Sequence, residues 1–255
     1  MRTNTANEWM PGIRAAVWLV SAVGLGMGVM MLIVLGAPLA SVGLAMVFSL
    51  ALSVLLLGLR PRQGFGLANQ VTFARALLLC VLAAALADPN LYLTAAWPLL
   101  LLALVVLLLD GVDGWAARKL DQCTQFGARF DMEVDAALIM VLCLALWLSG
   151  QVAGWVLMIG AMRYAFVAAS AIMPWLKRPL PDSFRRKLVC VLQVAALLIA
   201  LSPVPGSALQ ATLLAAALLA LTWSFAVDVR WLWRRRLPGV SNSHPRTGGQ
   251  HEPYP

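Results

Sequence analysis

The sequence predicts an all-α protein, a polytopic bundle of about eight transmembrane helices. Composition is the first reason: 62% of the residues are hydrophobic and 12% are charged, with a mean hydropathy of +0.84. Soluble domains have about 45–50% apolar and about 25% charged residues. The second reason is the length of the apolar runs, because a helix needs about 20 residues to cross the hydrocarbon. The candidate spans are residues 15–36, 39–59, 70–87, 94–118, 131–149, 152–176, 186–202 and 208–229.

The basic residues alternate with these runs. Lys and Arg precede the first run, follow every second run, and account for the formal net charge of +8. The loops on the other side carry neither residue; they lie near 37–38, 88–93, 150–151 and 203–207. The positive-inside rule therefore predicts a bacterial-type inner membrane protein with both termini in the cytoplasm. Anionic membrane lipids are expected partners of this charge, and no nucleic acid is required to explain it.

The two ends of the chain need separate interpretation. Arg2 and Arg14 precede the first run as in a signal peptide, but a second run follows at once, so we predict a mature membrane helix. Residues 238–255 are rich in Pro, Gly and Ser, which predicts a disordered cytoplasmic tail. Both histidines, His244 and His251, lie in that tail, which argues against a histidine base or metal site in the membrane. The four cysteines form no CxxC pair and are expected to be reduced.

The acidic residues are concentrated in one short region. Six of the 11 acids lie between residues 110 and 135: Asp110, Asp113, Asp121, Asp131, Glu133 and Asp135. Carboxylates close together at membrane depth repel one another unless they gain a partner. At about 100° per residue, Asp110 and Asp113 share one helix face, and Asp131 and Asp135 share a face of the next helix. Two antiparallel helices would bring these four carboxylates together to hold one or two Mg²⁺ or Mn²⁺ ions.

Small and basic residues accompany the acids. Gly114, Ala117 and Gly127 leave room for a ligand or a closely packed backbone. Arg118 adds a fixed positive charge of the kind that binds phosphate. Metal ions, an arginine and small residues at the membrane surface are suited to a diphosphate. Asp121 and Glu133 are expected to be solvated.

This stretch resembles the signature of the CDP-alcohol phosphatidyltransferases. The signature reads D-x-x-D-G-x-x-A-R, eight residues, then G-x-x-x-D-x-x-x-D. All eight defining positions match, namely Asp110, Asp113, Gly114, Ala117, Arg118, Gly127, Asp131 and Asp135. Two weaker similarities are N-x-x-T-x-x-R, formed by Asn69, Thr72 and Arg75, and K-x-x-T-x-x-Q, in which Cys190 replaces the threonine between Lys187 and Gln193. Residues 69, 72 and 75 could also serve only as a cap and an anchor.

The resemblance implies a function and a division of the chain. Members of the family cleave CDP-diacylglycerol, release CMP and join the phosphatidyl group to a small alcohol in phospholipid biosynthesis. Residues 65–237 would form the six-helix core, and residues 1–64 an added pair of membrane helices. Homodimers are common in the family. The roles carried over are metal binding by Asp110, Asp113, Asp131 and Asp135, catalysis by Asp131 and by Asp135 as base, and CDP binding by Gly114, Ala117, Arg118, Gly127, Asn69 and Thr72.

The acceptor alcohol is less defined. Arg163 lies inside the run 152–176 and is expected either to contact an acceptor anion or to form a buried pair with an aspartate. Lys187 is a second candidate for acceptor binding. The basic residues favour an anionic acceptor such as glycerol 3-phosphate.

Two other functions use intramembrane carboxylates. A prenyltransferase of the UbiA type binds a diphosphate through Mg²⁺, but its two aspartate motifs lie far apart in sequence, whereas the acids here span 26 residues. A cation transporter is expected to repeat its acids or broken helices in a second half, and we find no such acids there.

Overall fold

The computed structural model describes residues 10–59, 67–119, 124–177 and 183–234. This part of the chain is entirely helical and contains no strand, which confirms the all-α prediction. The predicted disordered tail lies outside the described residues. The helices are α1 (Met10–Val34), α2 (Leu39–Leu59), α3 (Leu67–Ala85), α4 (Leu91–Thr94), α5 (Ala96–Lys119), α6 (Gln125–Leu148), α7 (Leu157–Ile172), α8 (Phe184–Leu201) and α9 (Ser207–Arg234), with short 3-10 helices η2 (Gly154–Val156) and η3 (Pro174–Lys177).

Seven of the eight apolar runs each coincide with one long helix, but some helix ends differ from the ends of the runs. Helix α6 begins six residues before the apolar run at 131, because the Thr124 side chain caps it by accepting a hydrogen bond from the Gly127 amide at 3.0 Å. The run 152–176 is divided. Helix α7 ends before Pro174 because the residue that precedes a proline disfavours helical geometry.

Within the described part of the chain, four helical segments are long and apolar enough to cross a membrane: Val17–Val34, Leu39–Gly58, Gly154–Ile172 and Ser207–Arg234. Two shorter apolar segments, Asn69–Ala85 and Ala96–Val112, lie in α3 and α5. Large apolar side chains are exposed along these helices, including Leu19, Leu50 and Leu219. In water such a surface would be unstable, whereas lipid tails accommodate it. The chain is therefore a multi-pass membrane protein.

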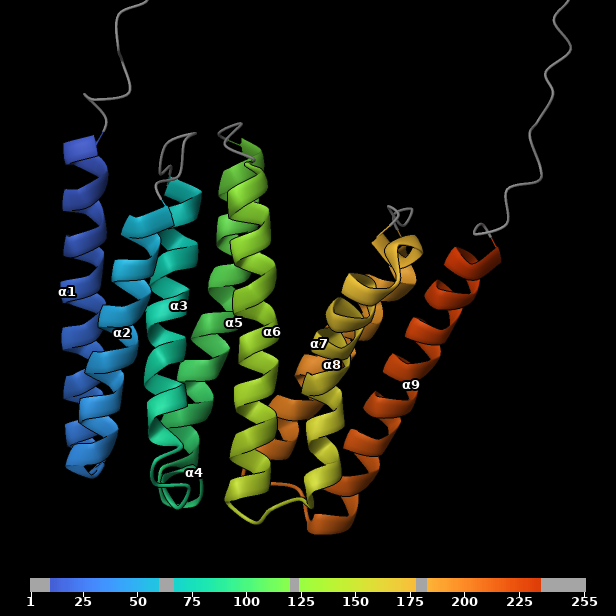
Figure 1. Ribbon diagram of the computed structural model, residues 1–255. Helices are drawn as coiled ribbons and strands as arrows, with labels where there is room; N and C mark the ends of the chain where they lie inside the picture. The colour runs from blue at the N-terminus through green and yellow to red at the C-terminus, as the bar shows by residue number, and fades with distance from the viewer. Residues whose placement is uncertain (1–9, 60–66, 120–123, 178–182, 235–255) are drawn as a thin grey trace, which may run out of the picture.

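Helix α3 is central in the packing. It packs against α1 and α2 on one side and against α5 and α6 on the other (Figure 1). Helices α8 and α9 pack closely together; α8 packs directly against α6, and α7 packs against both α6 and α9. In the described residues, α5 and α6 pack on α3 more than on each other.

The two N-terminal helices are fixed to α3 by small residues. A Cβ atom added to Gly28 of α1 would lie 2.2 Å from Val81 Cγ2 of α3, and one added to Gly24 would lie 3.2 Å from Leu77 Cδ1. Glycines four residues apart thus let the two backbones approach closely, as in other membrane helix pairs. Helix α2 joins α1 through a 2.9 Å hydrogen bond between the hydroxyls of Ser53 and Ser21. Together α1 and α2 cover the side of α3 that faces away from α5 and α6.

Candidate metal and nucleotide site

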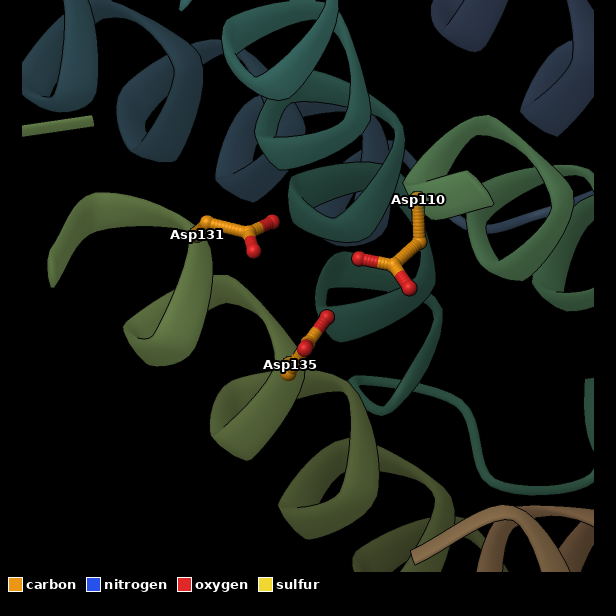
Figure 2. A group of neighbouring side chains, drawn as sticks. All are labelled: Asp110, Asp131 and Asp135. Carbon is orange, nitrogen blue, oxygen red and sulfur yellow. The ribbon is translucent and has the colours of Figure 1, made fainter. Parts of the chain in front are cut away.

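Three of the four predicted aspartates meet between α5 and α6. Asp110 comes from α5, and Asp131 and Asp135 come from successive turns of α6 (Figure 2). One oxygen of each carboxylate lies within 4.8 Å of one oxygen of the other two. The side chains of Asp110 and Asp131 are 36% exposed and that of Asp135 is 39% exposed, so an ion can reach the cluster from outside. The prediction that helical spacing brings these residues together is confirmed.

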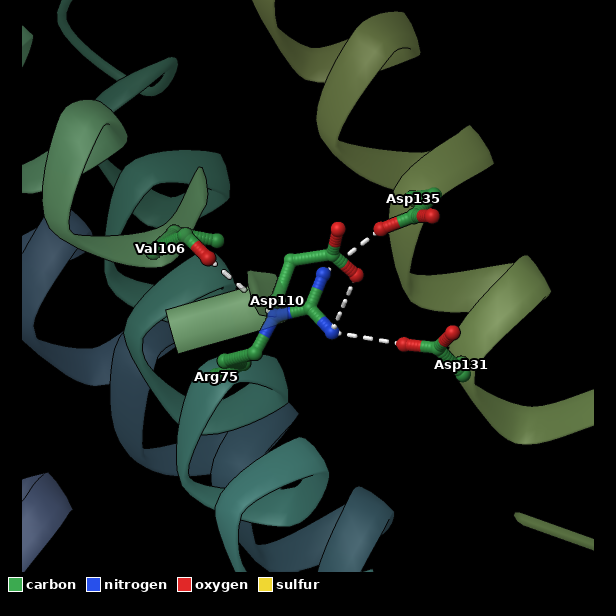
Figure 3. Close-up of polar contacts among 5 residues, drawn as sticks. All are labelled: Arg75, Val106, Asp110, Asp131 and Asp135. Carbon is green, nitrogen blue, oxygen red and sulfur yellow. Dashed lines mark hydrogen bonds and ion pairs between the residues drawn. The ribbon is translucent and has the colours of Figure 1, made fainter. Parts of the chain in front are cut away.

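A buried arginine from α3 joins these carboxylates. The Arg75 side chain is 0% exposed. Its Nη1 lies 2.6 Å from Asp131 Oδ1 and 3.0 Å from Asp110 Oδ1, and its Nη2 lies 2.6 Å from Asp135 Oδ1 (Figure 3). The third nitrogen, Nε, donates a 3.1 Å hydrogen bond to the carbonyl oxygen of Val106, one turn before Asp110 in α5. A single guanidinium therefore contacts both α5 and α6.

The charges of this cluster do not balance. Among the described side chains, three carboxylates carry three negative charges and Arg75 supplies one positive charge, which leaves an excess of two. One divalent cation has the charge to neutralise that excess. Carboxylate oxygens are hard ligands of the kind that Mg²⁺ and Mn²⁺ prefer. By charge and by ligand type, the residues present fit such an ion.

Arg75 was missing from the predicted site residues. The N-x-x-T-x-x-R spacing was a usable signal, because positions three apart lie on one face of a helix. Asn69, Thr72 and Arg75 are indeed all buried in α3. Sequence alone did not show that this face is turned toward the aspartates.

Gly127 and Asn69 mark a close contact between α6 and α3. A Cβ atom added to Gly127 would lie 2.5 Å from Asn69 Oδ1 and 3.0 Å from Thr124 Oγ1. A side chain at Gly127 would have to displace the end of the Asn69 side chain. The predicted nucleotide residues Asn69, Thr72 and Gly127 thus lie on the two helices that carry Arg75, Asp131 and Asp135.

The remaining predicted residues of the signature lie on the last turns of α5, but their side chains are outside the described residues. They are Asp113, Gly114, Ala117 and Arg118. The backbone is helical through Lys119, so Asp113 follows Asp110 by about one turn. Asp121 also lies outside the described residues.

Arg163 of α7 has a different partner from the one expected. Its Nη2 donates a 2.8 Å hydrogen bond to Glu133 Oε1, and the two side chains are 33% and 60% exposed. The expected buried pair with an aspartate is therefore wrong; the partner is a glutamate and the pair is partly exposed. The buried Nε atom of Arg163 has no hydrogen-bond partner among the described residues.

Helix α8 borders the same region. Cys190 lies on α8, which packs against α5 and α6, the two helices that carry the aspartates. Lys187, the second residue predicted to bind the acceptor, is exposed one turn earlier on α8. The predicted acceptor residues thus lie on α7 and α8, both of which pack against α6.

Asp228 lies within a helix in the second half of the chain, where we expected no acid. It lies in α9 and pairs with Arg185 of α8, and Arg186 Nη1 approaches its other carboxylate oxygen at 3.8 Å. Arg185 also donates a 2.7 Å hydrogen bond to the Ser224 carbonyl oxygen. With two arginines beside it, Asp228 links α8 to α9, and among the described residues it belongs to no group of three acids.

Comparison with known proteins assigns this arrangement to a family. The model of the CDP-alcohol phosphatidyltransferase family matches residues 65–227, which include all the described side chains of the cluster. The chain belongs to the CDP-alcohol phosphatidyltransferase family. It is therefore a membrane enzyme of phospholipid synthesis, from a metal-dependent family that acts on CDP-diacylglycerol and an alcohol. Searches of curated proteins and of solved structures found no match.

Proposed function

We propose that the enzyme transfers a phosphatidyl group from CDP-diacylglycerol to a small anionic alcohol, with glycerol 3-phosphate the favoured acceptor, and releases CMP. One observation carries this proposal: the carboxylates of Asp110, Asp131 and Asp135 lie close together, and all three residues fall within the region that matches the family. Asp113 completes the set in the proposal, and the four carboxylates hold two Mg²⁺ or Mn²⁺ ions. When bound, these ions stabilise negative charge on the phosphates and on the departing CMP.

The residues of the site have two separate roles in the proposal, nucleotide binding and proton transfer. Asn69, Thr72 and Gly127, with Gly114, Ala117 and Arg118 of α5, hold the cytidine diphosphate in our proposal. Asp135 accepts the proton of the acceptor hydroxyl as that oxygen forms a bond to the phosphatidyl phosphorus. The bond between this phosphorus and the CMP oxygen breaks, and CMP leaves with the bonding electrons.

Arg163 and Lys187 support an anionic acceptor. The Arg163 Nε atom has no partner among the described residues, although Nη2 is bound to Glu133. A phosphate oxygen of the acceptor would satisfy this buried donor. Glu133, the partner of Arg163, lies on α6 between Asp131 and Asp135, so an acceptor bound near Arg163 would lie beside the helix that carries the proposed base.

We also propose how the molecule lies in the membrane. All eight long helices cross it, the tail at 238–255 and both termini are cytoplasmic, and the site opens to the cytoplasm of a bacterial-type cell. The ends of α5 and α9 and the start of α8 carry Lys119, Arg234 and Arg185 on one side of the bundle (Figure 1). Residues 1–64 form the additional helix pair, residues 65–237 the enzyme core, and two chains can form a homodimer.

The direct test is CMP release by the purified protein from CDP-diacylglycerol with Mn²⁺ or Mg²⁺ and a panel of alcohols. We expect release only when the acceptor is present, with glycerol 3-phosphate the best of the panel. Asp135→Asn should reduce the rate at least about 100-fold, because the proposed base is lost. Asp88→Asn, at the opposite end of the bundle, is the matched control and should retain activity.

Other outcomes would change the assignment. Release with serine or inositol in place of glycerol 3-phosphate would retain the reaction and replace the acceptor. A normal rate in Asp135→Asn would remove Asp135 from catalysis. Transfer from a prenyl diphosphate, or ion flux without CMP release, would instead support one of the two alternative functions.

A further inference from the structure

We propose that Arg75 is the positioning residue of the metal site: its guanidinium holds Asp110, Asp131 and Asp135 in the arrangement that binds the ion. This inference rests on the proposed metal-dependent function and assigns a role within it. All three carboxylates direct the same atom, Oδ1, toward one guanidinium, at 2.6 to 3.0 Å. A carboxylate has a second oxygen, so a contact with arginine is compatible with metal binding by the same residue.

The surroundings of Arg75 make this role specific. Its side chain is fully buried, and Nε is fixed by the Val106 carbonyl oxygen of the same helix that carries Asp110. Every nitrogen of the guanidinium therefore has a defined direction, toward either α5 or α6. Helix α3 packs on both of these helices. The guanidinium thus determines the separation between the single carboxylate of α5 and the pair on α6.

Arg75 could act through its positive charge or through the geometry of its guanidinium, and these two possibilities predict different effects of substitution. Three carboxylates within 4.8 Å repel one another, and any cation between them would relieve part of that repulsion. Only arginine, however, has a planar fork of donors that can reach several carboxylates in fixed directions, whereas lysine is a flexible point charge. Arg75→Lys keeps the charge and removes the fork, and Arg75→Gln removes both.

The experiment measures metal binding without turnover. The thermal unfolding midpoint of the full chain in detergent is recorded in chelator and then in rising Mn²⁺, which gives the Mn²⁺ concentration of half-maximal stabilisation. We expect both Arg75→Lys and Arg75→Gln to raise this concentration about 10–100-fold, the usual cost of losing a residue that orients metal ligands. Arg185→Gln is the matched control, because Arg185 is also paired with an aspartate but joins α8 to α9. It should lower the midpoint in chelator and leave the Mn²⁺ concentration unchanged.

Two results would overturn the proposal. Unchanged Mn²⁺ binding in Arg75→Lys would show that charge alone matters. Tighter binding in Arg75→Gln would show that Arg75 competes with the ion. If neither variant folds, Asp110→Asn is compared with the double variant Arg75→Gln/Asp110→Asn, and equal Mn²⁺ binding by the two would also overturn it. Failure of the proposed function looks different, because the unmodified protein would then show neither Mn²⁺ stabilisation nor CMP release.

Discussion

Gly127 shows how a single residue can affect the site without touching the metal. A methyl group at this position would lie 2.5 Å from Asn69 Oδ1, so the Asn69 side chain must turn away in Gly127→Ala. We expect the variant to fold and its KM for CDP-diacylglycerol to rise about tenfold, which corresponds to the loss of about one hydrogen bond. Steady-state kinetics at saturating acceptor measure this change.

Gly111→Ala is the control for that substitution. Gly111 follows Asp110 in α5, and an added Cβ would have no atom within 4 Å. Its KM should remain unchanged, and its stability should rise by up to about 1 kcal/mol because alanine favours a helix. An equal effect of both substitutions on KM would contradict the contact with Asn69 as the cause.

At the scale of single residues, sequence spacing predicted the aspartates of the site but not the arginine that pairs with them. The acids are recognisable because Asp131 and Asp135 are one turn apart, and unpaired acids in a membrane segment need a reason. Arg75 is 35 residues or more from each of these acids in the sequence. Its role depends on how α3 packs against α5 and α6, which no local pattern encodes. The exposed partner of Arg163 was missed for the same reason, since Glu133 lies on another helix.

At the scale of the helices, the contact between α1 and α3 depends on the absence of a side chain at Gly28. Gly28→Ala would place a methyl group 2.2 Å from Val81 Cγ2. We expect it to destabilise the protein by about 1–3 kcal/mol through overpacking. Val81→Ala in the same chain removes the clashing methyl group and should restore part of that loss.

A double-mutant cycle tests this contact. Thermal or denaturant unfolding of the two single variants and the double variant gives the coupling energy, which we expect to be about 0.5–3 kcal/mol, with the double variant more stable than the sum of the single effects predicts. Additive effects would mean that α1 does not pack on α3 in this register.

The helices themselves were readily predicted, because each long apolar run has no other stable form in a bilayer. Their ends were harder to predict. The start of α6 depends on the Thr124 cap and not on hydrophobicity, and the Asp228 pair lies within an apolar run where a single acid was easily overlooked.

For the whole molecule, the excess negative charge at the cluster predicts a reversible dependence on divalent ions. Removing the ions with a chelator should abolish CMP release and lower the unfolding midpoint, since the carboxylates of Asp110, Asp131 and Asp135 then repel one another with Arg75 as the cation between them. Adding Mn²⁺ should restore both. Full activity in chelator would rule out the metal-dependent reaction, and loss that Mn²⁺ does not reverse would indicate unfolding.

The order of the helices in space could not be read from their order in sequence. Hydrophobicity gives each run a place in the membrane but no preferred neighbour, because lipid and apolar side chains are nearly equivalent surroundings. Small residues such as Gly24, Gly28 and Gly127 select the neighbours instead, and their partners are known only from the structure.

During synthesis, α1, α2 and α3 leave the ribosome before α5 and α6 exist. For that interval Arg75 lacks the carboxylates of Asp110, Asp131 and Asp135, and an arginine in a membrane helix can oppose insertion by up to about 2.5–3.5 kcal/mol. The first two helices are already available to α3 through Gly24 and Gly28. We therefore expect α1 and α2 to favour the insertion of α3 into the membrane. A nascent chain that ends after α3 should integrate α3 less often when residues 1–64 are removed. Equal integration with and without them, measured by a glycosylation tag, would rule this out.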